Sequence, residues 1–306
     1  MKKIYVQKNN TNITLVNYIL KTFPKLPRSF LYKALRNKDI KVNGKRVSKD
    51  IDLNDNDILE IYISDDILFN EIKKIEVIYK DENILVVFKP QGILSNNNII
   101  EMLNEKTMED LVKSFYPNAM ICHRLDRNTS GLLIFALNEL SYNEILNAFK
   151  NGLISKEYIA YVYGCDFKKN KESLISYLLK DSKTGFSKVY TNKILGSKKI
   201  LTDYEVIYIN KTLNYSVLKI IIHTGKTHQI RAHMLNISHP IIGDSKYGKN
   251  EINNLFKTYK QLLFAVKYSF NFKDDNFLYY LNDILIELDG NKYNKKLGSD
   301  FNEIQI

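Results

Sequence analysis

The chain has 306 residues, an apolar content of 44%, which is ordinary for a globular protein, and a formal net charge of +11 with a pI near 9.2. No run of 18 apolar residues is present, the first residues lack the apolar core of a secretion signal, and the two cysteines match neither a disulfide framework nor a zinc spacing. These features argue against membrane-spanning and disulfide-stabilised classes and favour a cytoplasmic protein of one large and one small domain, whose positive charge suits a polyanionic partner.

Much of that charge lies in the N-terminal segment. Residues 21–49 contain ten cations and a single anion, Asp39. Apolar spacing predicts a helix within 11–23 and a second helix capped by Ser29, followed by a strand at 40–42 and an Asn-Gly hairpin turn. A further strand is expected at 58–63. Two helices and a basic hairpin form a surface on which phosphates can dock, although a solvated basic face without a ligand has the same pattern.

The amino-acid sequence of this segment resembles that of the S4-like RNA-binding domain. The matching stretches are PRSFLYKALRNKDIKVNGKRV and LNDNDILEI, with Asp39 where a glycine is usual and Asn56 in place of the glycine of a Gly-Asp pair. The resemblance implies a small α/β RNA-binding domain over residues 1–63, joined by a linker at 64–74 to a domain over 75–306. Its candidate RNA-binding residues are Arg28, Lys33, Arg36, Lys38, Lys45 and Arg46.

The larger region begins with two short apolar strands, expected at 75–79 and 84–88, and the loop Lys89-Pro90-Gln91-Gly92. A helix is expected at 108–115. The stretch CHRLDRNTSGLLIFA then places Asp126 between Arg124 and Arg127, ahead of turn formers and a buried strand at 132–136. Polar groups on a loop beside a buried strand are typical of a site, although an Asp in such a place can simply cap a turn.

The remaining pattern predicts a helix at 139–149 and strands at 154–164, 201–206 and 215–222, with less distinct strands at 262–270 and 284–288. Three other site types fail in this part of the sequence. Ile220 occupies the first glycine position of a phosphate loop. His228 and His233 are five residues apart, which puts them on different helical faces and leaves a metal site incomplete. A kinase catalytic loop would require a Gly-rich loop and an Asp-Phe-Gly motif.

Four motifs resemble the RluA-type pseudouridine synthases: DENILVVFKPQGIL, HRLDRNTSGLLIFA, KEYIAYVYG and HTGKTHQIRAHM with HPIIGDSKYG. The resemblance implies that Asp126 is catalytic, that Tyr158 stacks on the target base and that Arg231 pairs with the Asp126 carboxylate. It also makes Arg124 a candidate for holding distorted RNA. Residues 95–98 replace a histidine-containing loop of the family, Lys226 replaces an arginine, and Phe264 replaces a histidine.

The implied fold is α+β, with a mixed, largely antiparallel sheet in the catalytic domain and the small α/β domain N-terminal to it in the sequence. The implied activity is isomerisation of uridine to pseudouridine in RNA, with large-subunit (23S) ribosomal RNA as the substrate by analogy. The same chemistry on transfer RNA and a non-enzymatic, RNA-binding ribosome assembly factor are the alternatives. The reaction adds and removes nothing, so we expect no cofactor and no metal, and no obligate protein partner is implied. The polar tail from residue 291 has no assigned role.

Overall fold

The computed structural model describes residues 2–7, 13–24, 26, 28–63, 75–96, 106–181, 184–258 and 260–290, without the side chains of residues 29 and 33. The chain forms two compact units, Met1–Lys74 with Asn98–Lys106, and Ile75–Asn97 with Thr107–Ile306. The predicted linker at 64–74 and the tail from residue 291 lie outside the described ranges. Each unit is described by itself below.

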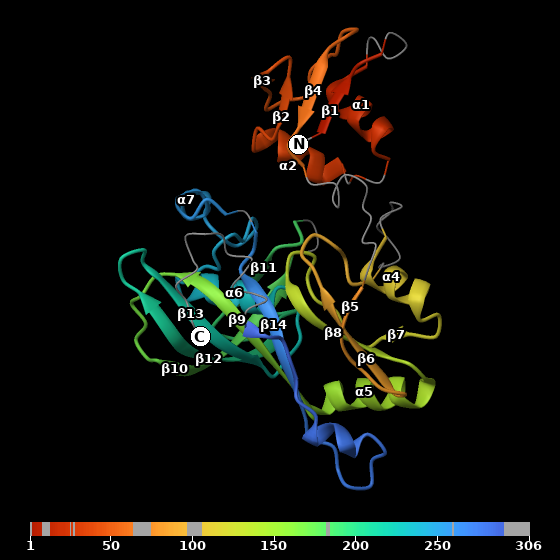
Figure 1. Cartoon of the computed structure of the whole chain (residues 1–306). Helices are drawn as coiled ribbons and strands as arrows, with labels where there is room; N and C mark the ends of the chain where they lie inside the picture. Colours follow the sequence, from red (N-terminus) through yellow and green to blue (C-terminus); the bar gives the residue numbers. More distant parts are fainter. Residues whose placement is uncertain are drawn as a thin grey trace. The chain divides into compact units, whose positions relative to one another are not determined.

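The N-terminal unit packs two helices against an antiparallel sheet with the strand order β1-β4-β2-β3 (Figure 1). The apolar residues of both helices and of alternate strand positions form one core, as helical and strand periodicity requires. Thr14 caps the first helix by accepting a hydrogen bond from the amide of Asn17. The elements are β1 (Lys2–Tyr5), α1 (Leu15–Thr22), α2 (Arg28–Arg36), β2 (Ile40–Val42), β3 (Lys45–Arg46) and β4 (Ile58–Ile61).

The turns of this unit follow its sequence closely, with one correction. Asn43 and Gly44 both have positive φ, as a two-residue hairpin turn requires. Asn56 also adopts a positive φ of 65°, which asparagine tolerates well, so its replacement of a glycine is accommodated. The predicted cap Ser29 is wrong, because α2 begins at Arg28 and Ser29 is therefore its second residue.

The C-terminal unit is built on one sheet in which, among the described strands, every pairing is antiparallel except that of β8 with β14. The order is β11-β10-β12-β13-β9-β14-β8-β6-β5, with β15 beside β14 and β7 beside β8. The predicted mixed, largely antiparallel sheet is thus confirmed. Its strands are β5 (Glu76–Lys80), β6 (Ile84–Lys89), β7 (Met120–Ile121), β8 (Ser130–Ala136), β9 (Ile154–Tyr163), β10 (Lys171–Lys180), β11 (Ser187–Tyr190), β12 (Lys198–Asn210), β13 (Tyr215–Ile222), β14 (Leu263–Phe270) and β15 (Ile286–Glu287).

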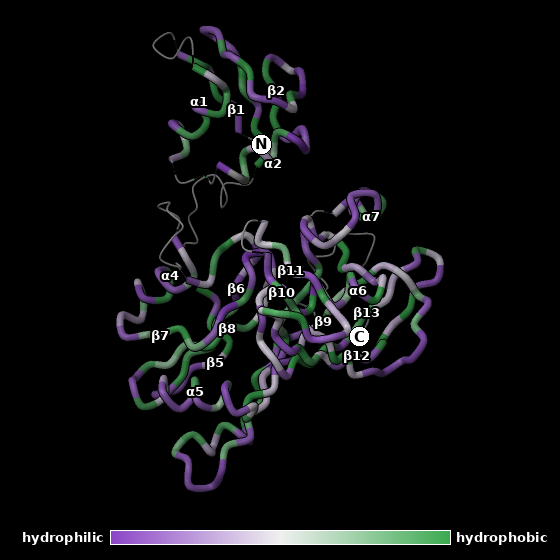
Figure 2. Tube along the Cα trace, turned by 180° about the vertical axis from the view of Figure 1, so that it is seen from behind, coloured by the Kyte–Doolittle hydropathy of each residue, from purple (hydrophilic) through white to green (hydrophobic). Residues whose placement is uncertain are grey.

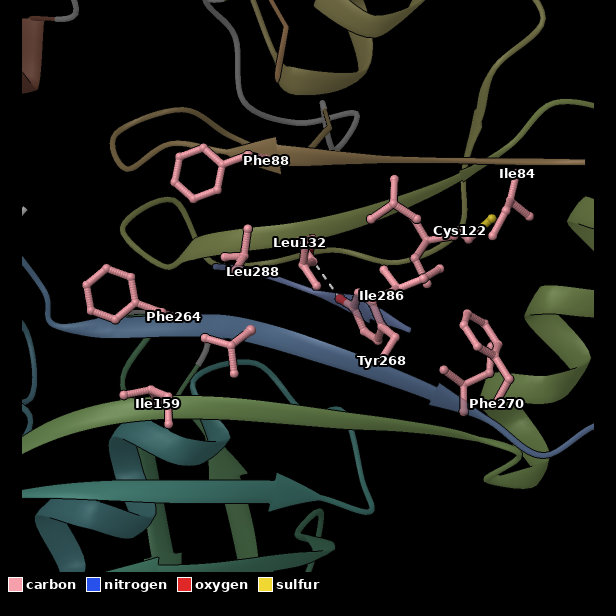
Figure 3. Packing of buried hydrophobic residues seen from close by; sticks show 14 of the residues in the cluster. Ile84, Phe88, Cys122, Leu132, Ile159, Phe264, Tyr268, Phe270, Ile286 and Leu288 are labelled. Atoms are coloured by element: carbon pink, nitrogen blue, oxygen red, sulfur yellow. Dashed lines mark hydrogen bonds between the residues drawn. The ribbon is translucent and has the colours of Figure 1, made fainter. Parts of the chain in front are cut away.

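Strand β14 joins the two halves of this sheet. Figure 1 shows β5–β8 on one side of it and β9–β13 on the other, and Figure 2 shows hydrophobic residues along many of the strands. In Figure 3, buried side chains such as Phe88, Leu132, Phe264 and Ile159 pack across the join, where the Tyr268 hydroxyl donates to the Leu132 carbonyl at 2.9 Å. The helices of this unit are α4 (Met108–Phe115), α5 (Glu139–Asn151), α6 (Gln229–Asn236), α7 (Asn250–Leu255) and the 3₁₀ helix η2 (Tyr279–Asp283).

Gly131 permits the parallel pairing of β8 with β14. It lies opposite Ala265 and has a φ of 127°, and a Cβ atom there would overlap the backbone of Ala265. Only glycine therefore fits this position, because it combines a positive φ with direct backbone contact. The strand that begins at Ser130 is fixed in this way directly after the loop that carries Asp126.

Candidate active site

A cavity of about 270 Å³ lies in the C-terminal unit where the loop between β7 and β8, strand β9 and the start of α6 meet. Its lining includes Asp126, Tyr158 and Arg231. The three residues predicted to be catalytic therefore lie around one pocket. They come from separate segments that the sheet order brings together, since only β14 separates β8 from β9.

The end of β6 and the segment that follows it hold the loop that carries Asp126. The ammonium group of Lys89, which is fully buried, donates to the carbonyls of Pro90, Arg127 and Thr129 at 2.8–3.1 Å. Burial lowers the pKa of Lys89 to about 7, while the nearby Asp126 carboxylate favours the charged form. The Ser95 hydroxyl adds two hydrogen bonds to the backbone of Leu125, each at 2.9 Å. The Lys-Pro-x-Gly motif thus supports the Asp126 loop.

Arg231 joins two carboxylates. Its Nη1 donates to Asp126 Oδ2 at 2.9 Å, and its Nε and Nη2 make a two-pronged contact with Asp244 at 2.7 and 2.9 Å. Asp244 is completely buried. Burial acts to raise its pKa, but the hydrogen bonds and charge of Arg231 outweigh burial and hold that pKa below its usual value. The planar guanidinium suits this geometry, because its fork can serve both carboxylates at once. Asp244 was not among the residues singled out from the sequence.

Tyr158 lies in β9 between strands β13 and β14, opposite Ile220 and Ala265. Only 5% of its surface is exposed. Burial, followed by the charge of Asp126, raises the pKa of its hydroxyl, so the phenol is protonated at neutral pH. Its ring contributes to the pocket wall as a rigid aromatic surface.

The start of α6 is anchored by the buried amide of Gln229. Its Oε1 accepts hydrogen bonds from the Thr224 hydroxyl and the Lys226 amide, at 2.8 and 3.1 Å. Its Nε2 donates to the Leu201 carbonyl and the Thr202 hydroxyl, both at 3.0 Å. These bonds fix the loop between β13 and α6, and with it the position of Arg231 two residues further on.

Three cationic side chains line the pocket and make no hydrogen bond or ion pair to the described part of the chain: those of Arg124, Lys156 and Lys226. Arg124 and Lys226 are exposed, whereas Lys156 is largely covered and its ammonium lies 4.7 Å from the centre of the Phe149 ring. Burial lowers the pKa of Lys156. An ammonium group kept in such a place without a protein anion favours an anionic ligand. Only Arg124 had been singled out; Lys156 was missed because its alternation in β9 looks like ordinary sheet.

His228 and His233, which the sequence places five residues apart, point in different directions. The ring of His228 faces the pocket, whereas His233 is turned to the Thr202 hydroxyl at 2.8 Å. The described residues contain no group of three metal-ligating side chains. Within the same residues, no helix is long and apolar enough to cross a membrane.

The candidate RNA-binding residues of the basic segment belong to the N-terminal unit. Arg46 donates to the Lys38 carbonyl, and its guanidinium lies 5.4 Å from the centre of the Tyr62 ring. The ammonium of Lys41 lies 5.1 Å from the same ring. Arg28 donates to the Asn17 side chain at 2.9 Å. Arg36 and Lys45 are exposed, and the side chain of Lys33 is not described.

This chain is similar to known proteins in sequence and in fold. A family profile described as RNA pseudouridylate synthase matches residues 83–236. A protein named "Uncharacterized RNA pseudouridine synthase" from Mycoplasma capricolum subsp. capricolum is 33% identical over 94% of this chain and 97% of its own length. Ribosomal large subunit pseudouridine synthase C of Buchnera aphidicola subsp. Acyrthosiphon pisum is 32% identical over 82% of each chain.

The solved structure of human RNA pseudouridylate synthase domain containing 1 has the same fold. It superposes with a TM-score of 0.56 over 74% of this chain and 96% of that chain, at 22% identity. The matched family span contains Asp126, Tyr158 and Arg231. The predicted enzyme class is confirmed: this chain belongs to the RNA pseudouridylate synthase family and is an RNA pseudouridine synthase.

Proposed function

We propose that this enzyme isomerises specific uridines in large-subunit (23S) ribosomal RNA, with Asp126 as the residue that starts glycosidic cleavage. The observation that carries the catalytic assignment is the Asp126 carboxylate, held by Arg231 at 2.9 Å and lining one pocket with Tyr158. The name of the Buchnera relative, ribosomal large subunit pseudouridine synthase, supports the RNA class. Membership of an enzyme family sets aside the assembly-factor alternative.

The pocket suits one nucleotide taken out of its stack. Its volume of about 270 Å³ is small for a ligand site and has room for about one nucleotide base. A base that stays in its stack cannot reach the pocket, so the target uridine must be flipped into it. Uracil stacks on Tyr158, Asp126 acts as nucleophile or base to release the base from the sugar, and the base rejoins the sugar through C5. The C5 proton then leaves. N1, which has lost its bond to the sugar, takes up a proton. Because the Tyr158 phenol is protonated at neutral pH, water takes the C5 proton directly, or the phenol relays it by giving its own hydrogen to water as it accepts the new one.

The unpaired cations of the pocket suit the phosphates on either side of the flipped nucleotide. Arg124 and Lys226 lie exposed around it, and Lys156 lies deeper. Each cation that meets a phosphate releases a condensed counterion, which makes binding dependent on salt. The positive charges of these three residues attract the phosphates to a pocket that also contains the negative Asp126 carboxylate.

Residues 1–63, within the N-terminal unit, are proposed as an S4-like RNA-binding domain joined by residues 64–74 to the catalytic domain at 75–306. Two helices packed on an antiparallel sheet with a basic Asn-Gly hairpin support this proposal. So does Tyr62, an aromatic ring with cations nearby, a combination that suits nucleic-acid bases and phosphates. Neutralising Arg36, Lys38 and Arg46 together should weaken RNA binding and reduce its salt dependence. An unchanged salt slope would remove this unit from the interface.

The function is tested by mapping pseudouridine on unmodified ribosomal and transfer RNA transcripts incubated with the wild type or with Asp126→Ala. We expect new pseudouridine in the ribosomal transcript with the wild type only, and unchanged RNA binding by the variant. Modification confined to transfer RNA would overturn the substrate assignment. Turnover by Asp126→Ala would overturn the catalytic assignment.

A further inference from the structure

The two oxygens of the Asp126 carboxylate have different surroundings. Oδ2 accepts the hydrogen bond from Arg231 Nη1 at 2.9 Å, and the Nε2 atom of His228 lies 3.8 Å from this same oxygen. Oδ1 has no hydrogen-bond partner among the described residues, and 21% of the Asp126 side chain is exposed in the pocket. One oxygen is therefore held by protein cations and dipoles, and the other is open.

His228 is held rigidly in this position by Tyr247. The Nδ1 atom of His228 lies 2.9 Å from the Tyr247 hydroxyl, which also accepts a hydrogen bond from the amide of Ser187 at 2.7 Å. The Tyr247 ring stacks on Phe186 at 4.4 Å, and the guanidinium of Arg231 lies 4.9 Å from its centre. His228 also has a φ of 61°, in the left-handed region, which histidine adopts more readily than most residues. Tyr247 thus supports both residues that approach Oδ2.

These contacts favour one of the two tautomers of the neutral His228 imidazole. The Tyr247 oxygen already accepts the Ser187 amide, so its own hydrogen is available to donate to Nδ1 of His228. The proton of the neutral imidazole is then on Nε2, which faces the Asp126 carboxylate. The opposite tautomer would aim a lone pair at a negative oxygen. Hydrogen bonding and electrostatics therefore favour the same tautomer.

We propose that His228 is a positioning residue, a neutral Nε2–H donor that holds Oδ2 of Asp126 together with Arg231 and leaves Oδ1 as the oxygen that acts on the nucleotide. The proposal rests on the catalytic role of Asp126 given above. At 3.8 Å the contact is charge–dipole in the free enzyme, and it shortens to a hydrogen bond when substrate closes the site, as catalytic contacts often do. No proton leaves His228 during the reaction.

The charge state of His228 is consistent with this role. Burial lowers its pKa to about 4; Asp126 and Asp244 act to raise that pKa, and Arg231 and Lys246 act to lower it further. The imidazole is therefore neutral at pH 7. A neutral donor orients the carboxylate without adding a second cation that would compete with the substrate for it.

The tautomer is tested directly by NMR on the full-length enzyme with ¹⁵N-labelled histidine at pH 7, with His228 assigned by its loss in His228→Gln. We expect the neutral Nε2–H pattern for His228 in the wild type. We also expect a shift toward Nδ1–H in Tyr247→Phe, provided that this variant melts as a folded protein. An Nδ1–H tautomer or an imidazolium in the wild type would overturn the proposal. This measurement needs no turnover, so its failure is distinct from failure of the proposed function.

A pair of amide variants tests the positioning role. The amide nitrogen of a glutamine can occupy the place of Nε2, whereas that of an asparagine reaches only the place of Nδ1. We expect His228→Gln to keep most single-turnover activity and His228→Asn to lose on the order of 10- to 100-fold in rate, because a misplacement of about 1 Å can cost about 100-fold. RNA affinity should be equal in both, since His228 acts on Asp126. Equal rates in the two variants, or a loss confined to RNA affinity, would overturn the role.

Discussion

Replacement of Arg231 by lysine tests the contact between α6 and Asp126 most sharply. The guanidinium serves two carboxylates at once through three charge-assisted hydrogen bonds. A lysine keeps the positive charge but has one compact ammonium group without the planar fork. It must therefore favour one carboxylate. Asp244 is fully buried and Asp126 is partly exposed, so Asp244 has the greater need of a partner and Asp126 is left without its donor.

The magnitude follows from these contacts. Removing one partner of a buried ion pair costs about 3–5 kcal/mol. The charge of the lysine recovers part of this, so the net loss of stability is that of one charge-assisted hydrogen bond, roughly 2–3 kcal/mol. With a shift of about 2–4 °C per kcal/mol for a domain of this size, we expect the Tm to fall by about 4–12 °C. Loss of orientation at Asp126 should lower the rate of the chemical step by about 100-fold.

The assay is single-turnover pseudouridine formation at a temperature well below both melting transitions, together with thermal unfolding followed by circular dichroism. Lys211→Arg, at an exposed cation in the turn between β12 and β13, is the control for an exchange of these two cations and should match the wild type in rate and Tm. If Arg231→Lys turned over within twofold of the wild type and melted at the same temperature, the guanidinium fork would have no role in holding Asp126.

Three further predictions concern other contacts of the same unit. Lys89→Met removes the donor to three loop carbonyls, so amide exchange at residues 127–130 should accelerate and turnover should fall by about 10-fold; unchanged exchange would contradict the support role. Nε2 of His123 accepts a hydrogen bond from the Ile134 amide, and burial lowers the pKa of His123 to about 3. The unfolded chain therefore binds a proton at His123 more tightly than the folded chain, and the protein loses stability as the pH falls below 6.5. By pH 5 this amounts to about 2 kcal/mol, a loss in urea unfolding that His123→Gln should lack. Lys156→Met should reduce the salt slope of RNA binding by about 1, whereas Lys267→Met, which removes a partner of Glu287, should not; equal slopes would place Lys156 away from phosphate.

The sequence determined the elements whose signals are local. Helix α4 and strand β13 span the predicted residues 108–115 and 215–222, because a capping threonine at 107 and a strong apolar period mark them. The Asn-Gly hairpin follows from the φ preference of two residues. Strand β10 was not predicted, since much of it is exposed on both faces and its hydrophobic alternation is weak. The motifs also identified Asp126, Tyr158 and Arg231 as a set.

Only the tertiary structure decided how these residues meet. Local spacing offered Arg124 and Arg127 as neighbours of Asp126, whereas the family resemblance implied Arg231. In the structure the Arg231 guanidinium, 105 positions away, donates to the carboxylate. The support of His228 by Tyr247 and the unpaired ammonium of Lys156 depend likewise on which strands lie side by side. Local sequence patterns indicate whether a segment forms a helix or a strand and which face it buries. The sheet order β13-β9-β14-β8 is set by packing between segments far apart in the sequence. For that reason the motifs predict the residues of the site and the pairing of Arg231 with Asp126, whereas the contacts of Asp244 and Tyr247 behind that pair are known only from the structure.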